Sequence, residues 1–160
     1  MTRPRDFDTL KAMVATGDID TVLVCFVDMQ GRLMGKRFHA VNFVETSFKE
    51  THCCNYLLAT DLEMATPDGY ASCSWQEGYG DYILAPDLTT IRPVPWLEGT
   101  ALVLCDVLDH HTHKPVPHDP GRGQGAGFRG QDSAFRECPL TSPDMTIAAT
   151  PRPFPRSSRL

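Results

Sequence analysis

The amino-acid composition changes at about residue 120, and this change limits how much of the 160-residue chain can build a hydrophobic core. Residues 1–120 contain repeated apolar runs, with 9 basic and 17 acidic side chains. Residues 121–160 contain 6 arginines, no lysine and 3 acidic side chains, and their apolar residues follow neither the helical nor the strand period. Such a segment buries too little apolar area to offset the entropy lost on ordering. We expect a folded domain over residues 1–120 and a disordered tail over residues 121–160.

The tail also differs in the kinds of residue it uses. Gly, Pro, Arg and Ala make up 20 of its 40 residues but only 28 of the first 120. The codons of these four amino acids are dominated by G and C, so a shifted reading frame in GC-rich DNA produces this kind of change. A natural flexible tail has the same signature, and composition alone does not separate the two explanations.

Charge and hydropathy exclude several classes of protein. The formal net charge is -5, which gives no general reason to expect binding to nucleic acid or to anionic membranes. No apolar stretch reaches about 18 residues, and the first residues lack the apolar core of a signal peptide. Cys25 and Cys105 lie inside apolar runs and none of the six cysteines forms a CxxC pair, which favours buried thiols in a reducing compartment. We expect a cytoplasmic protein without a membrane span.

The first 50 residues predict a helix, a hairpin and a second helix. Residues 6–16 have apolar side chains on one helical face, Asp6 or Asp8 can cap the start, and Gly17 ends it. Residues 22–28 and 32–38 flank a turn at Gln30 and Gly31, which predicts a β-hairpin. The second helix is expected within residues 41–50. The inward side chains of the two helices are expected to be Phe7, Leu10, Met13, Val14, Phe43, Val44 and Phe48.

The later strands complete a small sheet. "DYILAPD" and "LTTIRPVP" predict two short strands that proline confines to edges or strand ends. "TALVLCDVLD" predicts the most buried strand of the chain. This order of elements predicts an α+β fold in which a helix packs across one face of a small mixed or antiparallel sheet.

A long loop is expected within residues 53–81, since most of this segment is rich in Gly, Ser, Asp and Pro. Loops of this length inside compact domains are often functional. Asp68 stands beside Gly69 on an expected turn, and Trp75 follows seven residues later in a polar context. Trp75 can pack on a ligand or partner, or it can fold back and fix the loop. Spacing alone leaves both interpretations open.

Two other polar clusters have simpler explanations. Arg32, Lys36 and Arg37 lie close together after the hairpin turn, where a solvated strand end is expected. The four histidines of "HHTHKPVPHDP" are His110, His111, His113 and His118. Imidazole binds zinc and copper, but a metal site also needs fixed geometry and supporting contacts. We expect an exposed connection there, with a His-rich metal carrier as an alternative function.

Three ordered motifs resemble the amino-terminal domain of the glutamine synthetase family. They are "VDMQGRLMGKRF", "PDGYASCSWQEGYGDYILAPDLTTIRPVPWLEGTALVLCDVLD" and "HDP", and the resemblance covers about residues 6–120. It is strongest to the bacterial-type branch and its γ-glutamyl-amine ligase relatives. The resemblance implies a β-grasp domain, which is a small sheet with a helix across it.

The resemblance also implies a function. The family joins glutamate to ammonia or to an amine through γ-glutamyl phosphate, using ATP with Mg²⁺ or Mn²⁺. Its members form homo-oligomeric rings in which the β-grasp domain completes the active site of a neighbouring subunit. Asp68 matches the aspartate of the ammonium or amine site, and Trp75 matches the tryptophan at its mouth. Ser72, or Ala71 after a shift of one residue, matches the adjacent serine of the substrate site.

The sequence departs from the family after "HDP". The family continues with an arginine, a helix and a large domain whose glutamates hold the metals, whereas Gly121 follows here and residues 121–160 resemble none of this. We therefore expect no metal or nucleotide site in this chain and no ligation by the chain alone. The alternative is a β-grasp interaction module that modulates a full-length paralogue by entering its ring. Whether the amine is ammonia or a larger molecule stays open.

Overall fold

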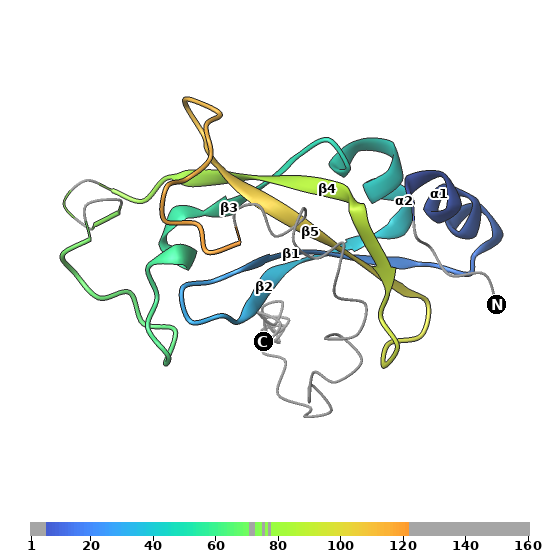
Figure 1. Ribbon diagram of the computed structural model, residues 1–160, viewed down its shortest axis with the longest axis horizontal. Coiled ribbons are helices and arrows are strands. Elements are labelled where there is room, and N and C mark those ends of the chain that lie inside the picture. Colours follow the sequence, from blue (N-terminus) through green and yellow to red (C-terminus); the bar gives the residue numbers. More distant parts are fainter. Residues whose placement is uncertain (1–5, 71–72, 75, 77, 122–160) are drawn as a thin grey trace, which may run out of the picture.

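The structure is a computed structural model that describes residues 6–70, 73–74, 76 and 78–121. Five strands form a single sheet, and short helical segments pack beside it (Figure 1). In chain order the elements are α1 (Phe7–Thr16), β1 (Thr21–Val27), β2 (Leu33–His39), α2 (Ala40–Asn42), the π-helical turn η1 (Phe43–Ser47), β3 (Thr51–Cys54), the 3₁₀ turn η2 (Asn55–Leu58), β4 (Asp81–Pro93) and β5 (Thr100–Asp109).

The sheet is mixed and has the strand order β2-β1-β5-β4-β3. β1 pairs in parallel with β5, whereas the other neighbouring strands are antiparallel. β1 and β2 form the predicted hairpin, in which Gly31 has the positive φ of 80° that its turn requires. β5 lies at the centre of the sheet and is the predicted buried strand. The α+β prediction is confirmed.

α1 follows the predicted helix closely. The Asp6 carboxylate caps the start by accepting a hydrogen bond of 2.7 Å from the Thr9 backbone N–H. Gly17 ends the helix with φ 80°. Leu10 is fully buried, and the rings of Phe7 and Phe48 lie 4.8 Å apart, so α1 packs beside the segment that contains α2 and η1 (Figure 1).

Strand alternation divides the apolar side chains between the two faces of the sheet. Val22, Val24 and Phe26 point from β1 into the larger core, which also contains Leu10 and Phe43 from the helical side. The intervening residues of β1 face the other way, into a smaller cluster made of Leu23, Cys25, Val94 and Leu102. The helices therefore cover the face of the sheet with the larger core.

The predicted second helix is shorter than expected. One α-helical turn at Ala40–Asn42 widens into the π-helical turn of η1, and the segment ends before residue 50. The inward residues are nevertheless as predicted, because Phe43 is fully buried and both Val44 and Phe48 pack against the larger core. β3 was not predicted, since four residues reading "THCC" carry no clear alternating pattern.

The prediction of two separate strands before β5 was wrong. Residues 81–93 form one strand, β4, whose pairing with β5 shifts register between Asp87 and Arg92. Proline was expected to confine these residues to edges or strand ends, but residues 82–84 lie inside the sheet between β3 and β5. β3 begins opposite Leu84, so Pro86 lies beyond the first residue of β3 and has a partner only on β5. There its missing N–H breaks no ladder.

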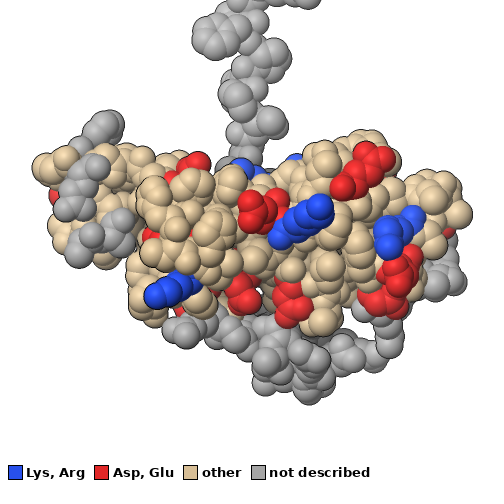
Figure 2. Space-filling view, turned by 90° about the horizontal axis from the view of Figure 1, so that it is seen from above, with Lys and Arg blue, Asp and Glu red and all other residues tan. Residues whose placement is uncertain are grey.

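On the face seen in Figure 2, Lys and Arg side chains lie among Asp and Glu side chains. Within the described residues, no helix is long and apolar enough to cross a membrane. The predicted disordered tail lies, apart from Gly121, outside the described residues, and the domain boundary at residue 120 stays a prediction.

Candidate functional site

Asp68 is the one predicted site residue whose position the structure describes. It is exposed and stands between Pro67 and Gly69, which has φ 101°. Among the described residues, no hydrogen bond or ion pair to its carboxylate is present. Ser72 and Trp75, like Ala71, lie outside the described residues. The carboxylate of Asp68 is therefore exposed and open to a ligand, whereas the assignments of Ser72 and Trp75 stay predictions.

The loop that carries Asp68 is closed at its base. The Asn55 backbone N–H donates to the Gly80 carbonyl over 2.9 Å, and the Gly80 N–H donates to the Asn55 side-chain oxygen over 3.2 Å. One step further into the loop, the rings of Tyr56 and Tyr79 pack edge to face with centroids 5.7 Å apart. These contacts join the end of β3 to the start of β4, so the long loop leaves the sheet and returns to it at one place.

The first part of the loop is a tight turn organised by Asp61. One carboxylate oxygen of Asp61 accepts hydrogen bonds from the backbone N–H groups of Glu63 at 3.0 Å and Ala65 at 2.8 Å. The Asp61 N–H donates to the Ala65 carbonyl over 3.0 Å. Met64 adopts φ 63°, which is uncommon for a residue with a side chain, and its side chain packs against the larger core. Backbone and side-chain contacts together hold this turn.

A buried carboxylate organises the neighbouring hairpin turn. Asp28 is fully buried and accepts hydrogen bonds from the Gln30 N–H at 3.0 Å and the Arg32 N–H at 2.7 Å. Its second oxygen pairs with Nε of Arg32 at 2.6 Å. Hydrogen bonds with an ionised partner are stronger than neutral ones, and together these three satisfy both oxygens of the buried carboxylate.

The same hairpin turn reaches across to the start of the loop. Gln30 Nε2 donates to the Thr60 carbonyl, and the two terminal nitrogens of Arg32 donate to the carbonyls of Asp61 and Leu62, each over 2.9 Å. Figure 1 shows the turn between β1 and β2 beside the segment that follows η2. The prediction that Arg32 is a solvated strand end was therefore wrong, although Lys36 and Arg37 are exposed as expected. The spacing of Asp28 and Arg32 around Gly31 was the available signal.

The histidine-rich connection is exposed, as predicted. All four of its histidines are exposed, and the His110 ring packs against His111 and His52 with centroids 5.3 Å away in each case. Over residues 6–70, 73–74, 76 and 78–121, no group of three or more His, Cys, Asp or Glu side chains is arranged to hold a metal ion. The structure thus gives the metal-carrier alternative no supporting cluster in this part of the chain.

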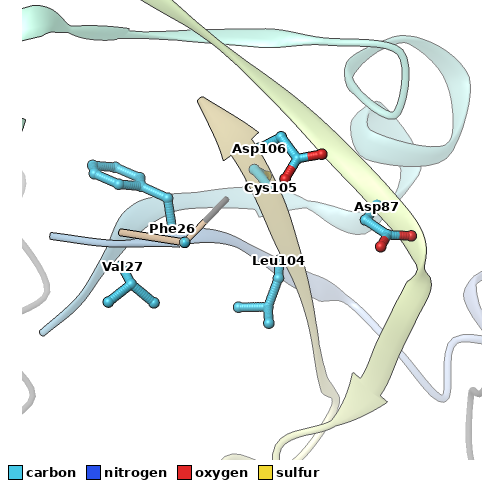
Figure 3. A pocket seen from close by; sticks show the side chains of 7 residues that line it. Phe26, Val27, Asp87, Leu104, Cys105 and Asp106 are labelled. Carbon is cyan, nitrogen blue, oxygen red and sulfur yellow. The ribbon is translucent and has the colours of Figure 1, made fainter. Parts of the chain in front are cut away.

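A small hollow lies along β1 and β5. Figure 3 shows the side chains of Phe26, Val27, Asp87, Leu104, Cys105 and Asp106 around it, and Gly121 completes its lining. Burial raises the pKa of the Cys105 thiol well above its usual range, so this sulfur is not a ready nucleophile. No residue of the Asp61 turn or of the segment with Asp68 lines the hollow. It is separate from the predicted amine site.

The other buried titratable groups are structural. Burial raises the pKa values of Cys25 and Cys53 to about 12, and the five described cysteines are free thiols, in accord with the predicted role of Cys25 and Cys105 as small buried residues. Asp119 is also buried, and its carboxylate accepts hydrogen bonds from Val107 N–H at 3.2 Å and Gly121 N–H at 2.9 Å. Burial raises the pKa of Asp119, and its contact with Val107 ties the connection that follows β5 back to that strand.

Comparison with known sequences bears on the resemblance. No family model matches the chain. It is 51% identical over 107 residues to the γ-glutamylethanolamide synthetase GlnA4 of Streptomyces coelicolor, a match that covers 66% of this chain and 23% of the relative. It is 36% identical over 104 residues to a glutamate–isopropylamine ligase of a Pseudomonas species, with coverage of 64% and 22%. Its homologues are γ-glutamylamine ligases of the glutamine synthetase family.

The match to these glutamine synthetase homologues is partial, because the chain spans less than a quarter of the length of either relative. Two solved structures of GmaS also align with 66% of the chain. The ADP complex aligns with a TM-score of 0.47 at 17% identity over 21% of its chain, and the ligand-free form with a TM-score of 0.45 at 20% identity over 22% of its chain.

Proposed function

We propose that this domain is part of an ATP-dependent carbon–nitrogen ligase that joins the γ-carboxyl group of glutamate to an amine. The observation that carries the proposal is the 51% identity over 107 residues with a γ-glutamylethanolamide synthetase. Both curated relatives are named for products or substrates with organic amines, which favours an organic amine over ammonia. In the intact enzyme, ATP and Mg²⁺ or Mn²⁺ activate the glutamate carboxyl group as γ-glutamyl phosphate.

Asp68 is the residue of this domain to which we assign a chemical role. An amine arrives at neutral pH as a cation, and a cation does not attack an acyl phosphate until it loses a proton. A carboxylate favours the cation nearby and can accept that proton. Asp68 is exposed at the end of a well-held segment, and its carboxylate has no hydrogen-bond partner among the described residues. Its oxygens are therefore available to an incoming ammonium group.

The rest of the proposed site involves other parts of the enzyme. We assign Ser72 and Trp75 to the same substrate site, and glutamate, nucleotide and metal binding to the large domain of a neighbouring subunit in a ring. Metal-assisted phosphoryl transfer needs fixed metals and charge clamps. Since the chain matches less than a quarter of its relatives, we propose that residues 1–160 alone do not catalyse ligation.

The test uses a complete ligase in which residues 1–120 are joined to a family-type carboxy-terminal domain. Asp68→Asn keeps the size of the side chain but removes the charge and the basic oxygen. We expect kcat/KM for the amine to fall about 100-fold, the scale of a lost general base. Transfer to hydroxylamine, which is already neutral at pH 7, should fall much less.

Glu63→Gln is the matched control, because Glu63 is another exposed carboxylate of the same loop and its side chain makes no hydrogen bond or ion pair with the described residues. We expect it to leave both reactions unchanged. Equal large losses with both nucleophiles in Asp68→Asn would indicate a collapsed loop. Little loss with either would mean that Asp68 only shapes the turn before Gly69.

A further inference from the structure

The hairpin turn and the loop with Asp68 are joined by one basic side chain. Arg32 uses a different nitrogen for each of its three shortest side-chain hydrogen bonds, which go to the Asp28 carboxylate, the Asp61 carbonyl and the Leu62 carbonyl. Only the planar guanidinium offers donors in such a fixed fork. Asp61 and Leu62 lie 29 and 30 residues from Arg32 along the chain, so Arg32 joins two segments that are distant in the sequence.

The hydrogen bonds from the hairpin turn hold three consecutive peptide groups of the loop. Gln30 holds the carbonyl of Thr60, and Arg32 holds the two carbonyls that follow it. Thr60 itself is almost fully buried. Three successive carbonyls that point at one hairpin leave this stretch of backbone little rotational freedom, since each φ/ψ change would break a hydrogen bond to a charged or amide donor.

The anchored stretch leads directly to Asp68. Asp61 starts the turn that ends at Ala65, and its carbonyl is one of the groups that Arg32 holds. Asp68 lies three residues after Ala65, a distance of at most about 10 Å of extended chain. Pro67 immediately precedes it and fixes one further backbone angle. The exposed carboxylate therefore lies a short chain distance from a turn that Arg32 and Gln30 help to hold.

We propose that Arg32 is a positioning residue for the amine site: it holds residues 60–62 and thereby orients the segment that presents Asp68. The importance of this orientation for catalysis rests on the proposed function, whereas the physical coupling between Arg32 and residues 61–69 does not. Arg32 touches no substrate in this arrangement, and its effect passes through the backbone of the Asp61 turn.

The experiment uses the 160-residue chain and the variant Arg32→Lys. Lysine keeps a cation beside the buried Asp28, which limits the risk of unfolding, but a single ammonium cannot span Asp28 and both carbonyls. Arg37→Lys is the matched control, since Arg37 is an exposed arginine on the same hairpin. Amide hydrogen exchange is measured by NMR for Glu63, Met64 and Ala65 and for β1 and β5, and backbone order parameters are measured for Asp68 and Gly69.

We expect Arg32→Lys to speed exchange in the turn by about tenfold or more, the scale of one lost charge-assisted hydrogen bond, with β1 and β5 unchanged. The order parameters of Asp68 and Gly69 should fall, and Arg37→Lys should change neither measurement. Unchanged exchange in the turn overturns the proposal, and so does equal acceleration of all amides, which indicates only a general loss of stability. A looser turn with unchanged order at Asp68 also overturns it.

Failure of the proposed function gives a different pattern. In that case Arg32→Lys loosens the turn and Asp68 as expected, but Asp68→Asn has no effect on amine use by the complete ligase. Conversely, if Asp68→Asn impairs amine use and Arg32→Lys leaves the turn intact, the function stands and the positioning role of Arg32 is lost.

Discussion

The segment that follows η2 has two parts, which the rest of the molecule holds in different ways. Residues 60–65 are held by the hairpin turn through Gln30 and Arg32, by the carboxylate of Asp61 and by the packing of Met64 against the core. Residues 66–70 follow at once, and Asp68 and Gly69 are exposed and make no hydrogen bond with the described residues. We call residues 60–65 the held base and residues 66–70 the exposed tip. This arrangement allows a side chain of the tip to be both well placed and open to a ligand.

The carboxylates of Asp28 and Asp68 differ most clearly in how they are held. Asp28 is fully buried and accepts three hydrogen bonds, whereas Asp68 is exposed and has no such partner among the described residues. The first carboxylate therefore contributes to stability and the second is available for chemistry. Residues at binding sites often contribute little to stability for this reason.

The largest expected effect comes from removing the buried carboxylate. Asp28→Ala leaves Arg32 without its ionic partner and two backbone N–H groups without an acceptor, so we expect the free energy of unfolding to fall by about 3 kcal/mol. Asp68→Ala should change it by no more than about 0.5 kcal/mol, as for other exposed sites. Urea denaturation of both variants measures the difference. Similar values for the two would remove the distinction between base and tip.

A smaller, pH-dependent effect is expected at Asp119, in the connection that follows β5. Burial raises the pKa of Asp119 in the folded state above its unfolded value, so the folded chain binds this proton more tightly. The group's contribution to stability is then greatest below the unfolded pKa, which is close to 3.8, and is lost as pH rises through the folded pKa.

Asp119→Asn removes this titration while keeping an oxygen that can accept a hydrogen bond. The unfolding free energy of the variant minus that of the unmodified chain should therefore increase as pH rises from about 4 through the folded pKa. Urea denaturation at a series of pH values gives this difference. A difference that is constant or decreases with pH would contradict the assigned effect of burial. This experiment adds Asp119, a buried carboxylate outside the loop, to the comparison of Asp28 with Asp68.

The sequence predicted the parts of the fold that depend on local patterns. Helical spacing and the Asp6 and Gly17 signals gave α1, and a turn residue between two apolar runs gave the hairpin. β4 was predicted as two strands because proline is a local signal for the end of a strand. The sheet accommodates Pro86 because no residue of β3 lies opposite it. Pairing between distant strands decides such cases, and no local pattern records it.

The candidate site was likewise predicted only in part from the sequence. Asp68 was found from a motif in a recognisable family, although its chemical role stays a proposal. The contacts of Arg32 with Asp61 and Leu62 were missed, because they join residues about 30 positions apart and depend on how the hairpin packs. Sequence patterns therefore identified the candidate functional side chain, and the structure was needed to find what holds its segment in place.

The contrast between base and tip is tested most directly by amide hydrogen exchange in the unmodified chain. The N–H groups of Glu63, Met64 and Ala65 donate hydrogen bonds within the turn, so we expect their exchange to be about 100-fold or more slower than in a free peptide. The N–H groups of Asp68 and Gly69 donate none to the described residues and should exchange within about tenfold of the free-peptide rate. Equal protection along residues 63–69, or no protection at Ala65, would contradict a held base that presents an exposed Asp68.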